Sequence, residues 1–289
     1  MSAVTTVPEV IAVRVPERSW RSELRAVKIV WRRELIRFVS DKAGMVAWLV
    51  QPLLFLFVLG TGLQQLSAAS TDGVDLKTFI FPGMLSFAVV FTAMFSAITL
   101  VMDRELGVMR EMMVAPVSRT SILLGKALGG TTVAASQGIV MLVLAGLVDV
   151  PYDPLMLAGL IVLLLITAFT VTAFGLMVAT RIKNIRTFTS IMQLFVFPLI
   201  FLSGSLFPVA NLPTWLELLN RVNPLTYVVD PMRRLVFDHL DVTDAARASL
   251  APGVNWFDWT LPVWFEVALV LLLGLVLMAI AVRQFLRAE

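Results

Sequence analysis

The stretch LMLAGLIVLLLITAFTVTAFGLMVAT, residues 155–180, decides the fold of this chain. It contains no Asp, Glu, Lys or Arg. A helix of about 20 apolar residues crosses the hydrocarbon core of a bilayer, which is about 30 Å thick. Helices of soluble proteins are rarely apolar on every side over such a length. We therefore expect residues 155–180 to form a transmembrane helix.

Five further runs of similar length carry almost no charged residues, so the sequence predicts an all-α integral membrane protein with six transmembrane helices over residues 45–282. The exceptions are Lys126 and Glu266, which lie close enough to the end of a run for their side chains to reach the membrane interface. The predicted spans are Met45–Leu63, Phe79–Met102, Ile122–Val148, Leu155–Thr180, Phe188–Phe207 and Leu261–Val282.

The composition agrees with a membrane protein and excludes several kinds of site. The chain is 58% hydrophobic and 15% charged, with a mean hydropathy of +0.89, whereas soluble domains are about 25% charged. It has no cysteine, and His239 is its single histidine, so no disulfide, thiolate metal site, histidine metal cluster or histidine-based catalytic triad is expected. The basic pI of about 9.6 reflects charges beside the apolar runs, so we expect no nucleic-acid partner.

The distribution of Lys and Arg predicts the orientation. Nine precede the first predicted span, four lie between the second and third (with Lys126), three between the fourth and fifth, and two in the tail 283–289. The opposite side holds five. Positive residues accumulate on the cytoplasmic side, so both termini are expected there.

The segment before the first span has two parts. Residues 1–19 show no signal-peptide pattern and are expected to form a disordered tail. Residues 20–42 predict an amphipathic helix that lies in the cytoplasmic interface and binds membrane lipids, although a soluble helix packed on another domain would look similar. Its apolar stripe consists of Trp20, Leu24, Val27, Trp31, Leu35 and Phe38.

The loop between the second and third spans, DRELGVMREMMVAPVSR (residues 103–119), is unusually rich in methionine. It can form three helical turns within residues 103–116, with Leu106, Met109 and Met113 on one face. Apolar side chains in a cytoplasmic loop favour an interface with a partner over a solvated turn.

Two blocks of sequence resemble the type-2 ATP-binding-cassette (ABC) permeases, in the branch of the daunorubicin-resistance and nodulation-factor exporters. The first is Arg104-Glu-x-Gly-x-x-x-Glu111, with Pro116-Val-Ser-Arg119 and Gly125-Lys126 after it. The second runs from Leu202-Ser-Gly-Ser-Leu-Phe-Pro208 through Leu212-Pro-x-Trp215 and Asn223-Pro-Leu-Thr-Tyr227 to Asp230-x-x-Arg233. The resemblance extends over nearly the whole chain.

The resemblance implies a half-transporter. Two permeases, here expected to be a homodimer, would pair around a pathway and rest on two copies of a cytoplasmic ATPase that binds ATP and Mg²⁺. The helix at 103–116 would dock into this ATPase through Glu105, Leu106, Met109, Arg110, Glu111 and Met113. The chain itself binds no cofactor and is no enzyme by this interpretation, because Thr120 stands where a phosphate-binding loop ending in Gly125-Lys126 would need glycine.

The connection between the fifth and sixth spans, residues 204–260, alternates apolar stretches with prolines. The resemblance implies short re-entrant helices at the exit, and a folded loop on the membrane surface is the alternative. Asp230 beside Arg233 and Arg234 forms either a local ion pair or a contact to a substrate or headgroup. The residues expected to shape the exit are Gly204, Pro208, Asn223, Pro224, Tyr227, Asp230 and Arg233.

Three amides, Gln51, Gln137 and Gln193, interrupt the apolar runs. Each either bonds a neighbouring helix or lines a translocation pathway. With no buried charge in view, an ion relay is not expected.

We therefore expect a multi-pass permease of a prokaryotic plasma membrane that exports a hydrophobic drug, lipid or glycolipid. An ion-coupled transporter and a membrane enzyme acting on lipids are the alternatives.

Overall fold

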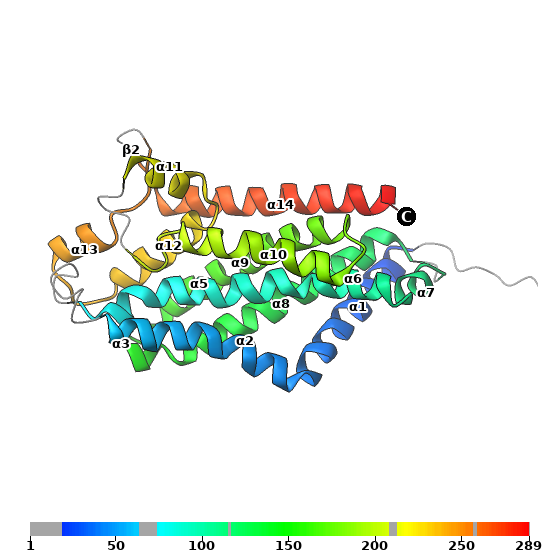
Figure 1. Ribbon diagram of the computed structural model, residues 1–289, viewed down its shortest axis with the longest axis horizontal. Helices are drawn as coiled ribbons and strands as arrows, with labels where there is room; N and C mark the ends of the chain where they lie inside the picture. The colour runs from blue at the N-terminus through cyan, green and yellow to red at the C-terminus, as the bar shows by residue number, and fades with distance from the viewer. Residues whose placement is uncertain (1–18, 64–73, 115–116, 208–212, 257–258, 289) are drawn as a thin grey trace, which may run out of the picture.

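The computed structural model describes residues 19–63, 74–114, 117–207, 213–256 and 259–288, and almost all of them are helical. Most long helices run side by side along the molecule (Figure 1). The helices are α1 (Trp20–Ser40), α2 (Lys42–Leu54), α3 (Gly60–Gly62), α5 (Leu76–Ser96), α6 (Ile98–Glu105), α7 (Val108–Val114), α8 (Arg119–Val143), α9 (Pro154–Ala179), α10 (Ile185–Phe201), α11 (Thr214–Val222), α12 (Thr226–Phe237), α13 (Asp244–Leu250) and α14 (Val263–Ala288), with a π-helical turn Phe55–Leu59 and a 3-10 turn Ala145–Val148.

Four helical segments of the described residues are long and apolar enough to cross a membrane. They are Lys42–Gly62, Leu76–Glu105, Pro154–Ala179 and Val263–Arg287, and they correspond to the first, second, fourth and sixth predicted spans. The all-α membrane class is thereby confirmed. The other two predicted spans fall on α8 and α10. Since α10 has 17 residues and α8 is less apolar, their crossing remains a prediction.

The central helix is α5, whose residues are nearly all buried. It packs against α2, α8, α9, α10 and α12. The helix α8 contacts α1, α5 and α9, so protein rather than solvent surrounds much of its length. This environment accounts for its modest hydropathy, because a helix covered by other helices does not need apolar side chains on all faces.

Close packing of α1 on α8 depends on two glycines spaced four residues apart. A Cβ atom on Gly125 would lie 2.6 Å from the Cβ of Val30, and one on Gly129 would lie 2.6 Å from the Cβ of Glu34. Such distances are below van der Waals contact, so only glycine, whose side chain is a single hydrogen atom, fits at these two positions while α1 and α8 lie this close. The sequence Gly125-x-x-x-Gly129 thus marks the contact between α1 and α8.

The face that α1 buries differs from its predicted apolar stripe. Ala26, Val30 and Glu34 are the buried residues of α1, whereas Trp20 and Leu24 of the stripe are exposed. The two faces are roughly 100° apart at 3.6 residues per turn. The stripe therefore lies beside the protein contact: Trp31 donates to the Thr132 hydroxyl of α8 at 3.1 Å, whereas Trp20 and Leu24 remain exposed.

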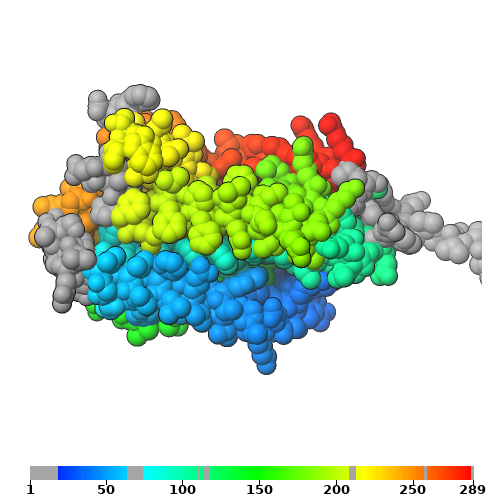
Figure 2. Space-filling model, viewed as in Figure 1, coloured from blue at the N-terminus to red at the C-terminus, as the bar shows by residue number. Residues whose placement is uncertain are grey.

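The two ends of the bundle carry different elements. Figure 1 places α1, α6, α7 and the C-terminus at one end, and α11, α12 and α13 at the other. A two-stranded hairpin, β1 (Asn255–Trp256) and β2 (Trp259–Thr260), also lies at this second end. The space-filling view shows α10 and α11 crossing one face, with α2 and α14 on either side (Figure 2).

Substituting Gly125→Leu is expected to lower the stability of the chain by about 1–3 kcal/mol, because the new side chain overpacks the α1–α8 contact. The measurement is the thermal unfolding midpoint of purified protein in detergent. Gly62→Leu is the matched control, since a Cβ at Gly62 meets no heavy atom within 4 Å. Equal midpoints for the two variants would contradict the proposed packing role.

Candidate functional site

The segment after the second span does not form the continuous helix of three turns expected for residues 103–116. Helix α6 ends at Glu105, and α7 begins at Val108. Between them Gly107 has a φ of +79°, a conformation that residues with a side chain rarely adopt. The prediction was wrong because this glycine ends α6 and turns the chain before α7 starts.

Arg104 and Glu105 attach the end of α6 to the loop between α9 and α10. The Arg104 guanidinium donates to the carbonyl oxygens of Ala179 at 3.2 Å and Ile182 at 3.0 Å, which lie at the C-terminus of α9. A carboxylate oxygen of Glu105 accepts from the backbone N–H of Ile185 at 3.1 Å, the first residue of α10. Each charge therefore lies at the helix terminus whose dipole attracts it.

A buried ion cluster connects α1, α6 and α8. Asp103 at the end of α6 is fully buried and pairs with Lys126 of α8 at 2.6 Å and with Arg37 of α1 at 3.2 Å. Arg33 of α1 also contacts Asp103. Lys126 pairs with Glu34 of α1 at 2.9 Å. We call Arg33, Glu34, Arg37, Asp103 and Lys126 the inner ion cluster.

The electrostatics of the cluster favour ionised carboxylates. Burial opposes ionisation of Glu34, but Lys126, Arg37 and Arg33 together outweigh it and hold the pKa of this carboxyl below its ordinary value. The expectation that Lys126 reaches the membrane interface was wrong, since the residue is buried among these carboxylates. The expectation of no buried charge was wrong for the same reason.

Glu23 provides a further link between α1 and α8. One carboxylate oxygen of Glu23 accepts from the backbone N–H of Ser118 at 3.1 Å and from the hydroxyl groups of Ser118 and Ser121 at 2.6 Å each. Ser118 is the N-cap of α8. The Glu23 charge thus lies at the positive end of the α8 dipole.

The residues predicted to dock an ATPase fall into three groups. Three of these residues are accessible to a partner: Glu105, Leu106 and Glu111. Leu106 has 67% of its surface exposed. Met109 is 1% exposed and packs inside the chain, so the prediction that it fills a groove on a partner was wrong. The side chains of Arg110 and Met113 lie outside the described residues.

At the opposite end of the bundle, residues of the second sequence block make contacts within the chain. Arg233 is buried, donates to the carbonyl oxygen of Gly204 at 2.6 Å and lies over the ring of Phe79 at 4.2 Å. The Asn223 amide donates to the carbonyl oxygen of Leu199 at 2.6 Å. These contacts fasten the start and middle of α12 to the N-terminal end of α5 and the C-terminal end of α10.

A second buried ion cluster joins α12 to α14. Arg234 pairs with Asp230 at 2.5 Å and with Glu266 at 3.1 Å, and Glu266 is fully buried. Glu266 was expected to reach the interface, and that prediction was wrong. The Tyr227 hydroxyl donates to the carbonyl oxygen of Arg221 at 2.5 Å and accepts from the Trp256 indole at 3.0 Å. Pro208 lies outside the described residues, and Pro224 lines an apolar cavity.

The three amides occupy different environments. Gln137 is buried, and its amide donates to the carbonyl oxygen of Met45 at 3.3 Å, which links α8 to α2. Gln51 is half-buried one residue before Pro52 in α2. Gln193 is exposed on α10 rather than deep in the bundle. The structure does not bring them together around one path.

A known protein family matches a region of the sequence that includes residues from both ends of the helix bundle. Residues 25–237, from α1 to the last residue of α12, match the family model described as ABC-2 type transporter. The chain belongs to the ABC-2 type transporter family. The matched region of this permease includes the two sequence blocks at residues 104–126 and 202–233.

The relatives of this permease are themselves named as transport proteins or nodulation proteins. "Putative transport permease ycf38" of Pyropia yezoensis is 32% identical over 218 residues, 73% of this chain and 71% of the relative. "Nodulation protein J" of Rhizobium leguminosarum bv. trifolii is 28% identical over 213 residues, 73% of this chain and 80% of the relative. "Probable multidrug ABC transporter permease YbhR" of Escherichia coli K12 is 25% identical over 168 residues, 56% of this chain and 44% of the relative.

Substituting Lys126→Met is expected to destabilise the permease by about 3–5 kcal/mol, because it removes the buried cation that pairs with both Asp103 and Glu34. Lys77→Met is the matched control, since Lys77 and Asp75 form a partly exposed pair at 3.5 Å, for which about 1 kcal/mol or less is expected. Thermal unfolding in detergent measures both. A Lys126→Met midpoint as high as that of Lys77→Met would refute the importance of the inner ion cluster.

The destabilisation by Lys126→Met is also expected to depend on pH. The lowered pKa of Glu34 means that its ionised form stabilises the folded chain above its ordinary pKa of 4.5, and this contribution disappears as the pH falls through the lowered value. The difference in unfolding midpoint between wild type and variant should therefore stay constant from about pH 7 to about pH 5 and shrink as the pH falls below 4.5. A difference that stays constant well below pH 4.5 would argue against this linkage.

Proposed function

We propose that this chain is the membrane subunit of an ATP-driven exporter that moves a hydrophobic or amphipathic cargo outward, powered by a separate cytoplasmic ATPase. Permeases of this family generally work with a separate ATPase subunit. The observation that carries the proposal is the group of accessible side chains Glu105, Leu106 and Glu111 in the segment around the turn between α6 and α7. The residues at the start of this segment are bonded to the helix bundle.

The bonds behind this segment support a role in transmitting force. Arg104 and Glu105 hold α9 and α10, while Asp103 holds α1 and α8 through the inner ion cluster. A push on α7 therefore reaches four other helices through polar contacts of about 3 Å, which cannot stretch without being broken. A solvated turn would need none of these attachments.

We place the docking contacts at Glu105, Leu106 and Glu111, with Arg110 and Met113 beside them in sequence. Lys183 and Arg186, exposed in and just after the loop that Glu105 holds, extend the same surface. ATP and Mg²⁺ would be bound by the ATPase, two copies of which would serve a homodimer of this permease.

The membrane arrangement follows from the same proposal. Helices α8 and α10 would complete six spans, with both termini in the cytoplasm of a prokaryotic cell. Helix α1 would lie at the inner interface, where exposed Trp20 and Leu24 meet lipid and nearby Arg21 and Arg25 meet anionic headgroups. Helices α11 and α12 would form the re-entrant region at the outer end.

The cargo class rests on analogy. One relative is named as a multidrug permease and another as a nodulation protein, which fits a drug, lipid or glycolipid. The buried carboxylates Asp230 and Glu266 keep an ion-coupled transporter in consideration, although Arg234 pairs with both. Export that survives removal of the ATPase would favour that alternative.

Docking is tested by affinity for the ATPase encoded beside this chain. Leu106→Ala with Glu111→Ala is expected to weaken binding about tenfold, which corresponds to about 1.4 kcal/mol for an interface anchor. Leu147→Ala is the control, because Leu147 is similarly exposed at the opposite end of the bundle. Binding unchanged by the double variant, or no effect of the permease on ATP hydrolysis, would contradict the proposal.

The orientation can be tested with single cysteines, because the chain has none. Asp244→Cys and Lys183→Cys introduce thiols at two exposed positions, in α13 and in the α9–α10 loop. A membrane-impermeant maleimide should label Asp244→Cys in intact cells and Lys183→Cys only after permeabilisation. Labelling of both in intact cells would mean that α10 or its neighbours do not cross as proposed.

A further inference from the structure

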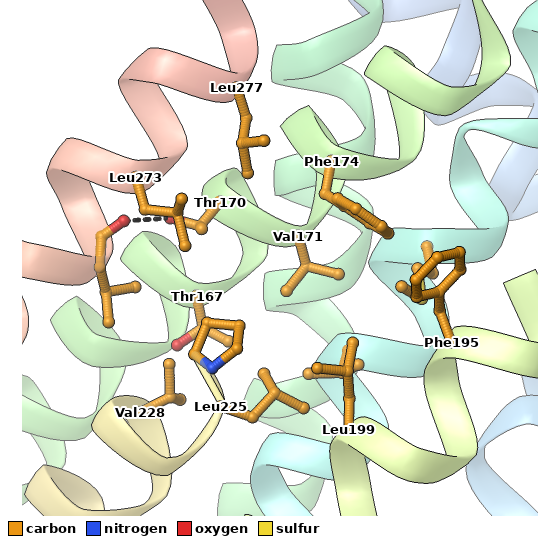
Figure 3. Close-up of a pocket in the computed structure, with 14 residues that line it drawn as sticks. Thr167, Thr170, Val171, Phe174, Phe195, Leu199, Leu225, Val228, Leu273 and Leu277 are labelled. Carbon is orange, nitrogen blue, oxygen red and sulfur yellow. Dashed lines mark hydrogen bonds between the residues drawn. The ribbon is translucent and has the colours of Figure 1, made fainter. Parts of the chain in front are cut away.

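A cavity of about 280 Å³ lies among α5, α9, α10, α12 and α14, beside the start of α12 (Figure 3). Its floor is one stripe of α9 that includes Val171 and Phe174. Phe195 and Leu199 project from α10 on one side, as Leu273 and Leu277 do from α14 on the other. None of these side chains belongs to either ion cluster or to the proposed docking surface.

The lining offers a ligand no free polar group. Its two hydroxyl groups are both used inside the chain: that of Thr167 donates to the carbonyl oxygen of Leu163 at 2.7 Å, and that of Thr170 donates to the carbonyl oxygen of Val270 at 3.0 Å. Every other lining side chain is a hydrocarbon, a proline ring or a methionine. Water entering the cavity would lose its hydrogen bonds, so the favoured occupant is apolar.

The cavity exists because α14 and α10 pack on different helices. Gly274 brings α14 close to α9, since a Cβ there would lie 2.5 Å from the Thr170 hydroxyl oxygen. Helix α10 instead packs mainly on α5 and α6. The two helices therefore diverge and leave a gap over α9.

This gap reaches a surface that faces the membrane. Phe195 lines the cavity and is also 44% exposed. Beside it, Leu194 of α10 is exposed, and Leu272 of α14 is exposed next to the lining residue Leu273. Since α9 and α14 are membrane-crossing by length and composition, hydrocarbon from the bilayer surrounds this opening.

We propose that this cavity binds one hydrocarbon chain of a membrane lipid, which enters sideways between α10 and α14. The volume is about twice that of an apolar cavity that holds benzene, about 150 Å³. It lies below the pocket volume that suits most drug-sized ligands, about 300–1,000 Å³. A segment of an acyl chain matches both its size and its lining. This lipid site goes beyond the proposed export function, because binding requires no ATPase.

The test uses the full chain in nanodiscs of dioleoylphosphatidylcholine that contain a small fraction of phosphatidylcholine with a diazirine near the end of one acyl chain. After illumination, mass spectrometry locates the crosslinked residues. Val171 and Val228 line the cavity but are buried, so bulk lipid cannot reach them. Crosslinks at these two residues are the expected result.

Two matched pairs of variants separate occupancy of the cavity from general contact with lipid. Val171→Phe should abolish the crosslink at Val228, whereas Val162→Phe, on the exposed side of the same helix, should leave it unchanged. Leu273→Trp and Leu272→Trp form the second pair and decide the matter if Val171→Phe does not fold.

The proposal is overturned if crosslinks appear only at exposed residues such as Leu194 and Leu272, or if the filling variants label Val228 as strongly as their controls. Crosslinks only at exposed residues are the result expected if a second copy of the chain covers the cavity and keeps lipid out. Because no ATPase is present, failure of this experiment leaves the docking proposal untouched, and failure of ATPase binding leaves this site untouched.

Discussion

The buried carboxylate of Asp103 is the constraint on which the end of the bundle formed by α1, α6 and α7 depends. A carboxylate without access to water is stable only when cations and hydrogen-bond donors surround it. Lys126 comes from α8, and Arg33 and Arg37 come from α1. Moving either helix away from α6 would break ion pairs to this buried carboxylate. The close approach of α1 to α8 at Gly125 brings these cations within reach.

This constraint fixes the C-terminal end of α6. Arg104 and Glu105, the next two residues, bind helix termini of α9 and α10, where the backbone leaves carbonyl and N–H groups without partners. Gly107 then turns the chain. One short run of sequence, Asp103 to Gly107, thus ends a helix, ties the bundle together and presents an exposed segment. Such a combination suits a part that must transmit movement without deforming.

The sequence predicts much of this fold but few of its contacts. Runs of apolar residues locate the helices because length and hydropathy measure how a segment is solvated. They do not show which side of a helix faces protein, so Lys126 and Glu266 were assigned to the interface when they are buried. A charge inside an apolar run needs a partner, and pairing Lys126 with Asp103 and Glu34 on that ground could have found the inner ion cluster. The apolar stripe of α1 was misleading for a related reason, since its protein-facing side contains Glu34.

The two ends and the middle of the bundle are held by different physical interactions. Ion pairs and bonds to helix termini fasten both ends, as at Asp103 and at Arg234. In the middle, small residues such as Gly274 allow close contact, and packing with a few hydrogen bonds, such as that of Thr170 to Val270, decides which helices touch. Lipid tails are as apolar as the side chains there, so no hydrophobic force drives α10 against α14 to close the gap over α9. The same gap in a soluble protein would collapse or fill with side chains. In a bilayer the surrounding hydrocarbon can fill it, which is why fixed ends and an open, apolar middle are compatible in one stable chain.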